Sequence, residues 1–163
     1  MSKKYFGTDG IRGEFGREPL TENFFLLLGS AIAKSLLKSN NDSKKKIVFG
    51  CDTRESSNKI IDLISVGLSS ENCIIHNAGI ISTPAIAFYT RKNNYDLGIV
   101  VSASHNPYQD NGIKIFNKNG YKISLEDENY IENYIEKLVN ENYTCNNNCN
   151  LVDISKDIKK EYI

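Results

Sequence analysis

Apolar residues recur at intervals of three and four residues in four stretches of this chain. That spacing places them on one face of an α-helix, so each stretch is predicted to form an amphipathic helix. Each stretch also begins at a serine or threonine that can cap a first turn, and in one case a proline follows directly. The predicted helices cover residues 21–37, 57–68, 83–93 and 124–139, and the predicted capping residues are Thr21, Ser57, Thr83 and Ser124.

Short apolar runs lie between these helices. Residues 47–49, 73–76 and 96–102 have the length and composition of buried strands. The last run is apolar on both faces, which is typical of a sheet that helices cover on both sides. Because strands alternate with helices, the chain is predicted to form an α/β domain of three layers, with a mixed, mostly parallel sheet between helices.

The hydrophobic pattern changes in the last third of the chain. Ile113 and Ile115 alternate with Lys114, residues 119–120 are the turn sequence Asn-Gly, and residues 121–123 alternate again. This pattern predicts a β-hairpin. Since successive side chains of a strand point to opposite faces, Lys114 is expected to point away from the face that buries the two isoleucines.

The same patterns indicate how the chain divides. Residues 1–139 are predicted to form one domain with a hydrophobic core of its own. Residues 140–150 are rich in asparagine and lose the periodicity, as is typical of a linker. Residues 151–163 are too few for a further domain and are predicted to be the start of a truncated second one.

Composition narrows the class of protein. Twenty basic and twenty acidic residues cancel, so net charge favours binding neither to nucleic acid nor to a membrane surface, and no such partner is expected. No apolar stretch approaches the roughly 20 residues that span a bilayer. Four cysteines in a chain that begins without an export segment suggest a reducing compartment. A soluble, cytoplasmic protein is therefore expected.

The main candidate for chemistry is residues 102–116, which read SASHNPYQDNGIKIF and follow a predicted strand. In a parallel α/β sheet, ligands gather at the carboxyl ends of the strands. A serine there can accept a phosphoryl group, because its hydroxyl is exposed and nearby backbone N–H groups can bind charged oxygens. His105 and Lys114 can move protons or neutralise phosphate, and Asn106 can hold the loop's shape. The alternative, from the residues alone, is a polar surface turn with a satisfied histidine.

Two more motifs can contribute to a site. Residues 6–13 read FGTDGIRG, where the glycines allow close backbone approach to a ligand and Arg12 suits planar contacts with phosphate. An ordinary glycine-rich turn is the alternative. Asp52 and Arg54, in the sequence DTR, are interpreted as an internal ion pair that orders an edge of the site.

Three other residues are interpreted as structural. His76 lies at a predicted strand end and is expected to be packed rather than catalytic. Cys145 and Cys149 lie in the predicted linker without a second pair of ligands, so no zinc site is expected there. With two histidines in the chain, a metal is expected to use oxygen ligands, which suits Mg²⁺.

Taken together, FGTDGIRG, DTR and SASHNPYQDNGIK, in this order and spacing, resemble the N-terminal domain of the α-D-phosphohexomutases, and most closely their bacterial phosphoglucosamine mutase branch. SASHNP followed by DNGIK is the most specific part of the match. The family's phosphoserine directly precedes His-Asn-Pro, which corresponds to Ser104 and not to Ser102. The resemblance implies that His105, Lys114 and Arg12 transfer protons and stabilise phosphate. The expected supporting residues are Asn106, Ser102, Thr8, Asp9 and Gly10.

The resemblance implies the interconversion of glucosamine 6-phosphate and glucosamine 1-phosphate. Ser104 is expected to give its phosphoryl group to the free hydroxyl of the sugar, and the resulting glucosamine 1,6-bisphosphate to turn and return its other phosphate. The resemblance also implies one Mg²⁺ per active site, bound to the phosphate of Ser104. A phosphomannomutase or phosphoglucomutase activity is the alternative within the family.

The family folds as four domains around one cleft, and the resemblance covers the first domain with the start of the second. The family's metal loop, sugar-recognition loop and distal phosphate loop are not found in the sequence, so this chain alone is expected to fold without turnover. Its expected partners are a hexosamine phosphate and the remaining domains of the same protein, and a homodimer is left open. A free-standing domain that binds sugar phosphates or protein partners without catalysis is the alternative from another class.

Overall fold

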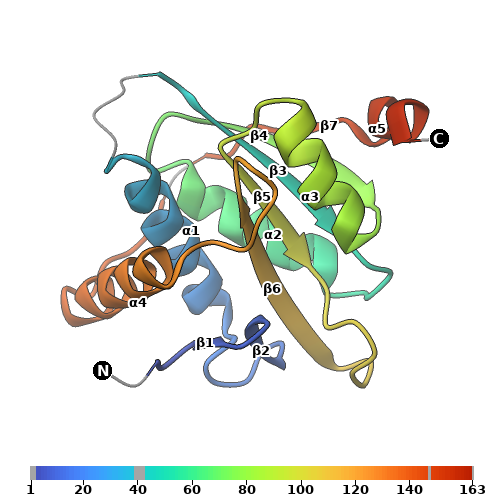
Figure 1. Cartoon of the computed structure of the whole chain (residues 1–163). Helices are drawn as coiled ribbons and strands as arrows, with labels where there is room; N and C mark the ends of the chain where they lie inside the picture. Colours follow the sequence, from blue (N-terminus) through green and yellow to red (C-terminus); the bar gives the residue numbers. More distant parts are fainter. Residues whose placement is uncertain (1–2, 39–42, 147, 163) are drawn as a thin grey trace.

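The computed structural model of this 163-residue chain describes residues 3–38, 43–146 and 148–162. A central sheet lies between helices, with α3 on one side and α1, α2 and α4 on the other (Figure 1). The strands are β1 (Phe6–Gly7), β2 (Gly10–Glu14), β3 (Lys45–Cys51), β4 (Cys73–Ile80), β5 (Leu97–Val101), β6 (Asp110–Asn117) and β7 (Leu151–Asp153), and the helices are α1 (Glu22–Leu36), α2 (Ser57–Leu68), α3 (Thr83–Lys92), α4 (Leu125–Asn140) and α5 (Ser155–Tyr162).

The described strands form one mixed sheet in the order β1-β2-β6-β5-β3-β4-β7. Strands β5, β3, β4 and β7 run parallel to one another, whereas β6 returns antiparallel beside β5 and carries β2 and β1 with it. The predicted α/β fold of three layers with a mixed sheet is confirmed. The sheet is not mostly parallel, however: within the described strands three pairs are antiparallel and three parallel, because β6 pairs antiparallel with both β5 and β2, and β2 pairs antiparallel with β1.

Two hydrophobic layers fix the helices to the sheet. Ile47, Phe49 and Ile99 belong to the larger layer, which lies under α1, α2 and α4. Val48 and Val100 point the other way and pack under α3 and α5. Residues on β3 and β5 therefore alternate between two cores, as expected for strands that are buried on both faces.

The predicted caps of α1 and α4 are confirmed. The hydroxyl of Thr21 accepts the N–H of Phe24 at 3.2 Å, and the hydroxyl of Ser124 accepts the N–H of Asp127 at 3.1 Å. The predictions for α2 and α3 are wrong by one residue. These helices begin at residues 57 and 83 themselves, and the residues before them make no side-chain cap.

The predicted hairpin after β6 is only partly correct. Gly120, with a φ of +79°, forms the turn. The return is not a strand, since it pairs with β6 only through one bridge between Phe116 and Lys122. Tyr121 is 68% exposed, so the return contributes a single buried apolar side chain before α4 begins, which is too little to hold a second strand against the sheet.

The C-terminal residues join the same sheet. β7 pairs in parallel with β4, and Ile158 of α5 is fully buried in the smaller hydrophobic layer. The division into a domain at residues 1–139, a linker at 140–150 and a second domain from 151 stays a prediction, and residues 1–2, 39–42, 147 and 163 of those ranges lie outside the described part.

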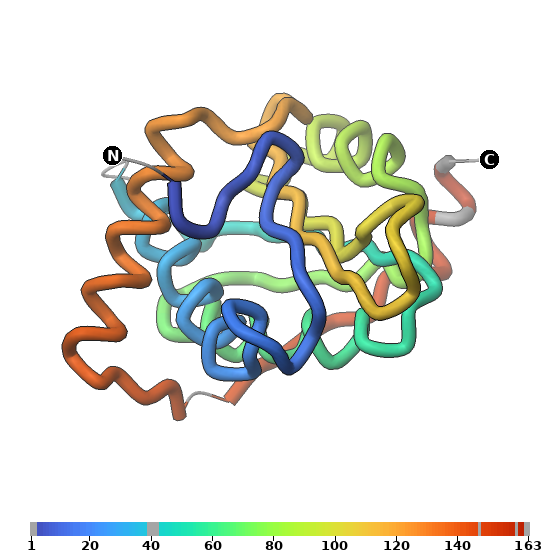
Figure 2. Tube along the Cα trace, turned by 90° about the horizontal axis from the view of Figure 1, so that it is seen from below, coloured from blue at the N-terminus to red at the C-terminus, as the bar shows by residue number. Residues whose placement is uncertain are grey.

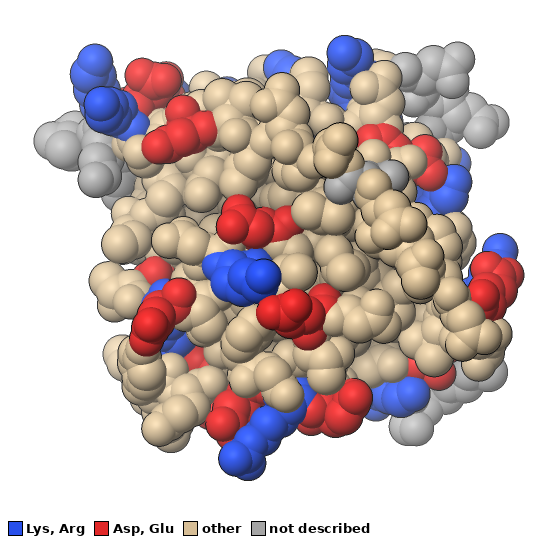
Figure 3. All heavy atoms as spheres, turned by 180° about the vertical axis from the view of Figure 1, so that it is seen from behind, with Lys and Arg blue, Asp and Glu red and all other residues tan. Residues whose placement is uncertain are grey.

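The distribution of surface charge and the length of the helices can be compared with the expectations about nucleic acid and membranes. On the face opposite to the view of Figure 1, acidic and basic side chains lie next to one another with wide uncharged areas between them (Figure 3). Among the described residues, no helix is both long and apolar enough to cross a membrane.

Candidate active site

Ser104 lies in the loop between β5 and β6, at the carboxyl end of a parallel strand. The loop leaves the sheet at Ser102, whose N–H donates to the carbonyl oxygen of Gly112 at 2.8 Å. The hydroxyl oxygen of Ser102 accepts the N–H of Ser104 at 3.1 Å. Ser104 is exposed and has a φ of +54°, in the left-handed region that residues other than glycine seldom adopt. The loop thus turns sharply and leaves the hydroxyl of Ser104 at the surface.

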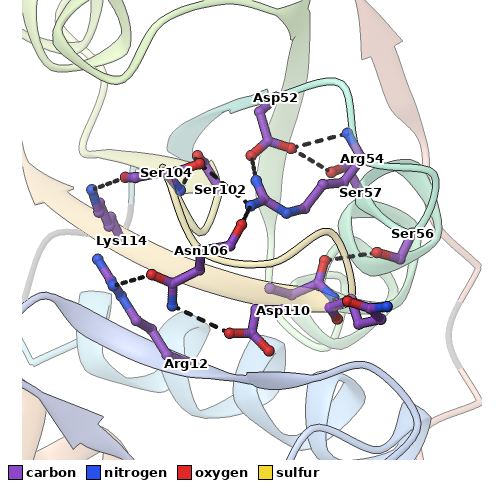
Figure 4. A network of polar contacts seen from close by, with 12 residues as sticks. Arg12, Asp52, Arg54, Ser56, Ser57, Ser102, Ser104, Asn106, Asp110 and Lys114 are labelled. Carbon is purple, nitrogen blue, oxygen red and sulfur yellow. Dashed lines mark hydrogen bonds and ion pairs between the residues drawn. The ribbon is translucent and has the colours of Figure 1, made fainter.

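Lys114 reaches this hydroxyl from the neighbouring strand. Its Nζ donates to the Oγ of Ser104 at 3.3 Å (Figure 4). Ile113 and Ile115, on either side of it in β6, are buried in the larger hydrophobic layer. The prediction that Lys114 points away from that layer is therefore confirmed.

A hollow of about 220 Å³ lies beside this contact and is bordered by Lys114. Apolar side chains, among them Phe6 and Ile115, line part of it. The polar residues that line it are Thr8, Asp9, Thr83, Lys114, Lys122 and Glu128. Lys114 therefore stands between the exposed hydroxyl of Ser104 and a concave surface.

The pairing of β2 with β6 positions Arg12 at the site. In the register of β2 and β6, Arg12 lies opposite Gly112, and its Nη1 donates to the Oδ1 of Asn106 at 3.5 Å. The amide of Asn106 also donates to the carboxylate of Asp110 at 3.3 Å. Figure 4 shows Arg12 and Lys114 on the same side of the Ser104 loop. Five of the predicted residues are thus brought together: Arg12, Ser102, Ser104, Asn106 and Lys114.

The turn between β1 and β2 needs glycine at position 10. Gly10 has a φ of +90°, and a Cβ there would lie 2.1 Å from the carbonyl oxygen of Ile113. Neighbouring Asp9 is exposed, and its carboxylate lies 3.8 Å from the guanidinium of Arg12. Thr8 is exposed as well, and its carbonyl oxygen accepts from Lys122 at 2.9 Å. Gly10 of the FGTDGIRG motif therefore allows the backbone of this turn to lie close against the backbone of β6.

Sequence reasoning missed the contacts of Arg54 with the Ser104 loop. Its predicted ion pair with Asp52 is confirmed, but its Nη2 also donates to the carbonyl oxygens of Asn106 at 3.0 Å and Ser104 at 3.4 Å. The available signal was the position of DTR after β3, since β3 and β5 are neighbours whose ends lie at the same edge of the sheet.

Asn111 is a second residue that sequence reasoning missed. It is buried at the start of β6, and its Oδ1 accepts from the hydroxyl of Ser56 at 2.7 Å. Its amide donates to the carbonyl oxygen of Gln109 at 3.2 Å. These bonds attach the far end of the Ser104 loop to the start of α2.

The two histidines differ. His105 is exposed beside Ser104 and, within the described residues, is not part of the hydrogen-bond network of Figure 4. His76 is half-buried on β4, and its Nδ1 lies 2.6 Å from the hydroxyl oxygen of Tyr95. Burial, with a smaller effect from the charge of Lys46, lowers the pKa of His76 below its usual range. The prediction that His76 is packed is confirmed.

The arrangement suits an anion at Ser104. Arg12 and Lys114 face the loop with guanidinium and ammonium groups, which form strong, charge-assisted bonds with phosphate oxygens. For a metal the fit is poor within residues 3–38, 43–146 and 148–162, where no three His, Cys, Asp or Glu side chains are grouped to hold an ion.

Known proteins resemble this chain in sequence. A sequence model of the family described as phosphoglucomutase/phosphomannomutase, alpha/beta/alpha domain I, matches residues 3–142. The phosphoglucosamine mutase of Koribacter versatilis is 45% identical over 130 residues, which are 80% of this chain and 28% of that protein. The phosphoglucosamine mutase of Fusobacterium nucleatum is 48% identical over 130 residues, 79% of this chain and 28% of that protein. The chain thus spans just over a quarter of the length of these relatives.

Solved structures agree with the fold. A phosphoglucomutase/phosphomannomutase family protein from Burkholderia thailandensis superimposes with a TM-score of 0.72 over 96% of this chain and 34% of its own, at 21% identity. Parafusin from Paramecium, a phosphoglucomutase in its open form, gives a TM-score of 0.67 over 82% of this chain and 25% of its own, at 28% identity. The chain belongs to the phosphoglucomutase/phosphomannomutase family, and residues 3–142 correspond to its α/β/α domain I.

Proposed function

We propose that this chain carries the phosphoserine of a phosphoglucosamine mutase, and that Ser104 is that serine. The observation that carries the proposal is the contact of 3.3 Å between the Nζ of Lys114 and the exposed Oγ of Ser104. The names of relatives at 45% and 48% identity support the choice of substrate. Since the chain spans 28% of those proteins, the activity is proposed for the protein of which it forms this part.

The proposed reaction has two half-reactions. In the first, the bond between phosphorus and the Oγ of Ser104 breaks while a hydroxyl of glucosamine 6-phosphate forms a new bond to phosphorus. The hydroxyl gives its proton to a base, for which exposed His105 is the candidate, and the Oγ of Ser104 takes a proton from Lys114. The bisphosphate then turns, and the second half-reaction transfers its other phosphoryl group to Ser104, with the proton movements reversed.

The residues of this chain would contribute mainly position and charge. Phosphoryl transfer needs little covalent help from a protein, so fixed cations near the transferred group give most of the effect. Arg12 and Lys114 are those cations. Mg²⁺ belongs to the proposal as an ion that an oxygen of the Ser104 phosphate would bind; it would offset negative charge there, and its other ligands would come from a further part of the protein. A homodimer and a cytoplasmic location stay predictions.

A second candidate is a phosphoglucomutase or phosphomannomutase activity, favoured by the names of the structural relatives. Both candidates use the same serine and the same cations. They differ in the substituent at one carbon of the sugar. Comparing kcat/KM for glucosamine, mannose and glucose 6-phosphates in the complete protein would separate them.

The test is made on the complete protein with glucosamine 6-phosphate, following product by ³¹P NMR. Phosphopeptide mapping should place the phosphate on Ser104, and Ser104→Ala should reduce turnover to background. Ser35→Ala is the control, because the hydroxyl of Ser35 donates within α1, to the carbonyl oxygen of Ile32. Phosphate on Ser102, or turnover that survives in Ser104→Ala, would refute the assignment.

A further inference from the structure

We infer that Arg54 is a positioning residue that holds the backbone around Ser104 in its left-handed conformation, without binding the phosphoryl group itself. The inference deepens the proposed function and rests on it for the role of Ser104. It assigns a task to the DTR motif that goes beyond an internal ion pair.

The contacts of Arg54 converge on the backbone of the loop. Its Nη2 donates to two carbonyl oxygens that are two residues apart, those of Ser104 and Asn106, at 3.4 and 3.0 Å. Both oxygens reach one nitrogen because the chain curls between them. The curl includes Ser104 at a φ of +54°, and a residue persists in that region only where its surroundings determine it. Arg54 supplies that determination through charge-assisted hydrogen bonds.

The guanidinium of Arg54 is also held in place by contacts outside the loop. It forms an ion pair with Asp52 and its side chain is 10% exposed. The carboxylate of Asp52 also accepts the N–H of Arg54 at 3.1 Å and the hydroxyl of Ser57 at 3.3 Å. The N–H of Asp52 donates to the carbonyl oxygen of Val101, the last residue of β5, at 3.1 Å. Arg54 is therefore tied to the strand from which the loop departs.

The same contacts explain why Arg54 is not a phosphate ligand. One terminal nitrogen of its guanidinium serves Asp52 and the other serves the two carbonyl oxygens. The remaining nitrogen, Nε, is buried without a hydrogen-bond partner among the described residues. In contrast, Lys114 reaches the Oγ of Ser104 directly. Arg54 acts on the reaction through the placement of Ser104 against Lys114.

A lysine at position 54 separates geometry from charge. It keeps a positive charge near Asp52, but it lacks the planar fork that reaches Asp52 and two carbonyl oxygens at once. Arg17→Lys is the matched control, because Arg17 pairs with Glu14 at the surface, with its side chain 75% exposed. Misplacement of a reacting group by about 1 Å costs on the order of 10²-fold in rate.

The experiment measures hydrogen exchange and turnover in the complete protein. In Arg54→Lys, backbone amides of residues 103–110 should exchange at least about tenfold faster with those of β3 and β5 unchanged, and kcat should fall about 10²-fold with KM nearly constant. Arg17→Lys should change neither quantity. Exchange of the loop as in the unmodified protein would overturn the proposal, and so would loosening of the whole domain, which would make Arg54 a general stabilising residue.

A double variant tests whether Arg54 acts through Lys114. If it does, Arg54→Lys should cost little further turnover once Lys114→Met is present, whereas independent roles would give multiplied losses and contradict the inference. Hydrogen exchange does not depend on the reaction. Fast loop exchange in Arg54→Lys together with no mutase activity in the unmodified protein would therefore refute the proposed function and leave the positioning role standing.

Discussion

The ammonium nitrogen of Lys114, on β6, lies 3.3 Å from the hydroxyl oxygen of Ser104, in the loop that precedes that strand. Lys114→Met keeps most of the length of the side chain and removes its charge. We expect the fold to be retained and kcat to fall by about 10²–10³-fold, as when one donor to a developing negative charge is removed. The measurement is turnover in the complete protein, together with Tm.

Lys118→Met is the control for this variant. Lys118 is exposed in the turn after β6 and is not among the residues around Ser104. Its loss should leave turnover and Tm unchanged. Normal turnover in Lys114→Met would show that the ammonium group has no part in the reaction, and a large loss of Tm would show that it is structural.

Gly10 and Gly16 offer a matched pair for a test of the FGTDGIRG turn. Both have positive φ, +90° and +86°, but a Cβ at Gly10 would lie 2.1 Å from the carbonyl oxygen of Ile113, whereas nothing lies within 4 Å of one at Gly16. Gly16→Ala should cost about 1–2 kcal/mol of unfolding free energy from backbone strain alone. Gly10→Ala should cost clearly more, because β2 must move from β6. Equal losses in urea titrations would contradict this account.

Glu132 on α4 holds the N-terminal segment, which runs beside the start of that helix (Figure 2). Its carboxylate accepts the N–H groups of Lys4, Tyr5 and Phe6 at 3.0, 2.8 and 2.7 Å. We expect Glu132→Ala to lower the unfolding free energy by roughly 2–4 kcal/mol, because it leaves donors without their charged acceptor. Glu126→Ala on the exposed side of α4 should cost only a few tenths of a kcal/mol. A similar cost at both positions in urea titrations would rule out the clamp.

Glu128 makes stability depend on pH. It is 1% exposed, and burial alone would raise its pKa, but hydrogen bonds from Lys122 and Lys3 and their charges hold the pKa below the ordinary value. A lowered pKa in the folded state means that the carboxylate stabilises the fold above the unfolded pKa and loses that effect as pH falls through the folded one.

Glu128→Gln tests this sign. The variant should be less stable than the unmodified protein at about pH 7, and the gap should narrow by about pH 3, below the usual carboxyl range of roughly 4. Urea unfolding at both pH values measures it. A gap that widens toward acid would mean that the buried carboxyl is protonated more readily in the fold than outside it.

The sequence by itself determined the features that depend on near neighbours. The alternation of Ile113, Lys114 and Ile115 placed the lysine opposite the core, and the structure agrees. Thr21 and Ser124 were predictable as caps for the same reason, since a capping hydroxyl reaches an N–H three residues along the chain. The position of the Ser104 loop after a buried strand was equally visible. In each case the period of a helix or strand fixes the geometry within a few residues.

Local patterns misjudged the hairpin return and the starts of α2 and α3. Residues 121–123 alternate like a strand, but whether they pair depends on burial of Tyr121, which the fold leaves 68% exposed. A serine or threonine at a helix start can stand just outside or just inside the first turn, and the residues that pack against that turn decide between the two.

Only the tertiary structure decided which distant residues meet. Arg54 and Asn106 are 52 positions apart in sequence, Arg12 and Asn106 94, and Glu132 and Phe6 126. The first two contacts follow from the strand order β2-β6-β5-β3 and from the register that sets Arg12 opposite Gly112, and the third follows from the position of α4 beside the N-terminal segment. Strand order and register are settled by how whole hydrophobic faces fit together, because burial of all of them at once selects one arrangement that no single segment specifies.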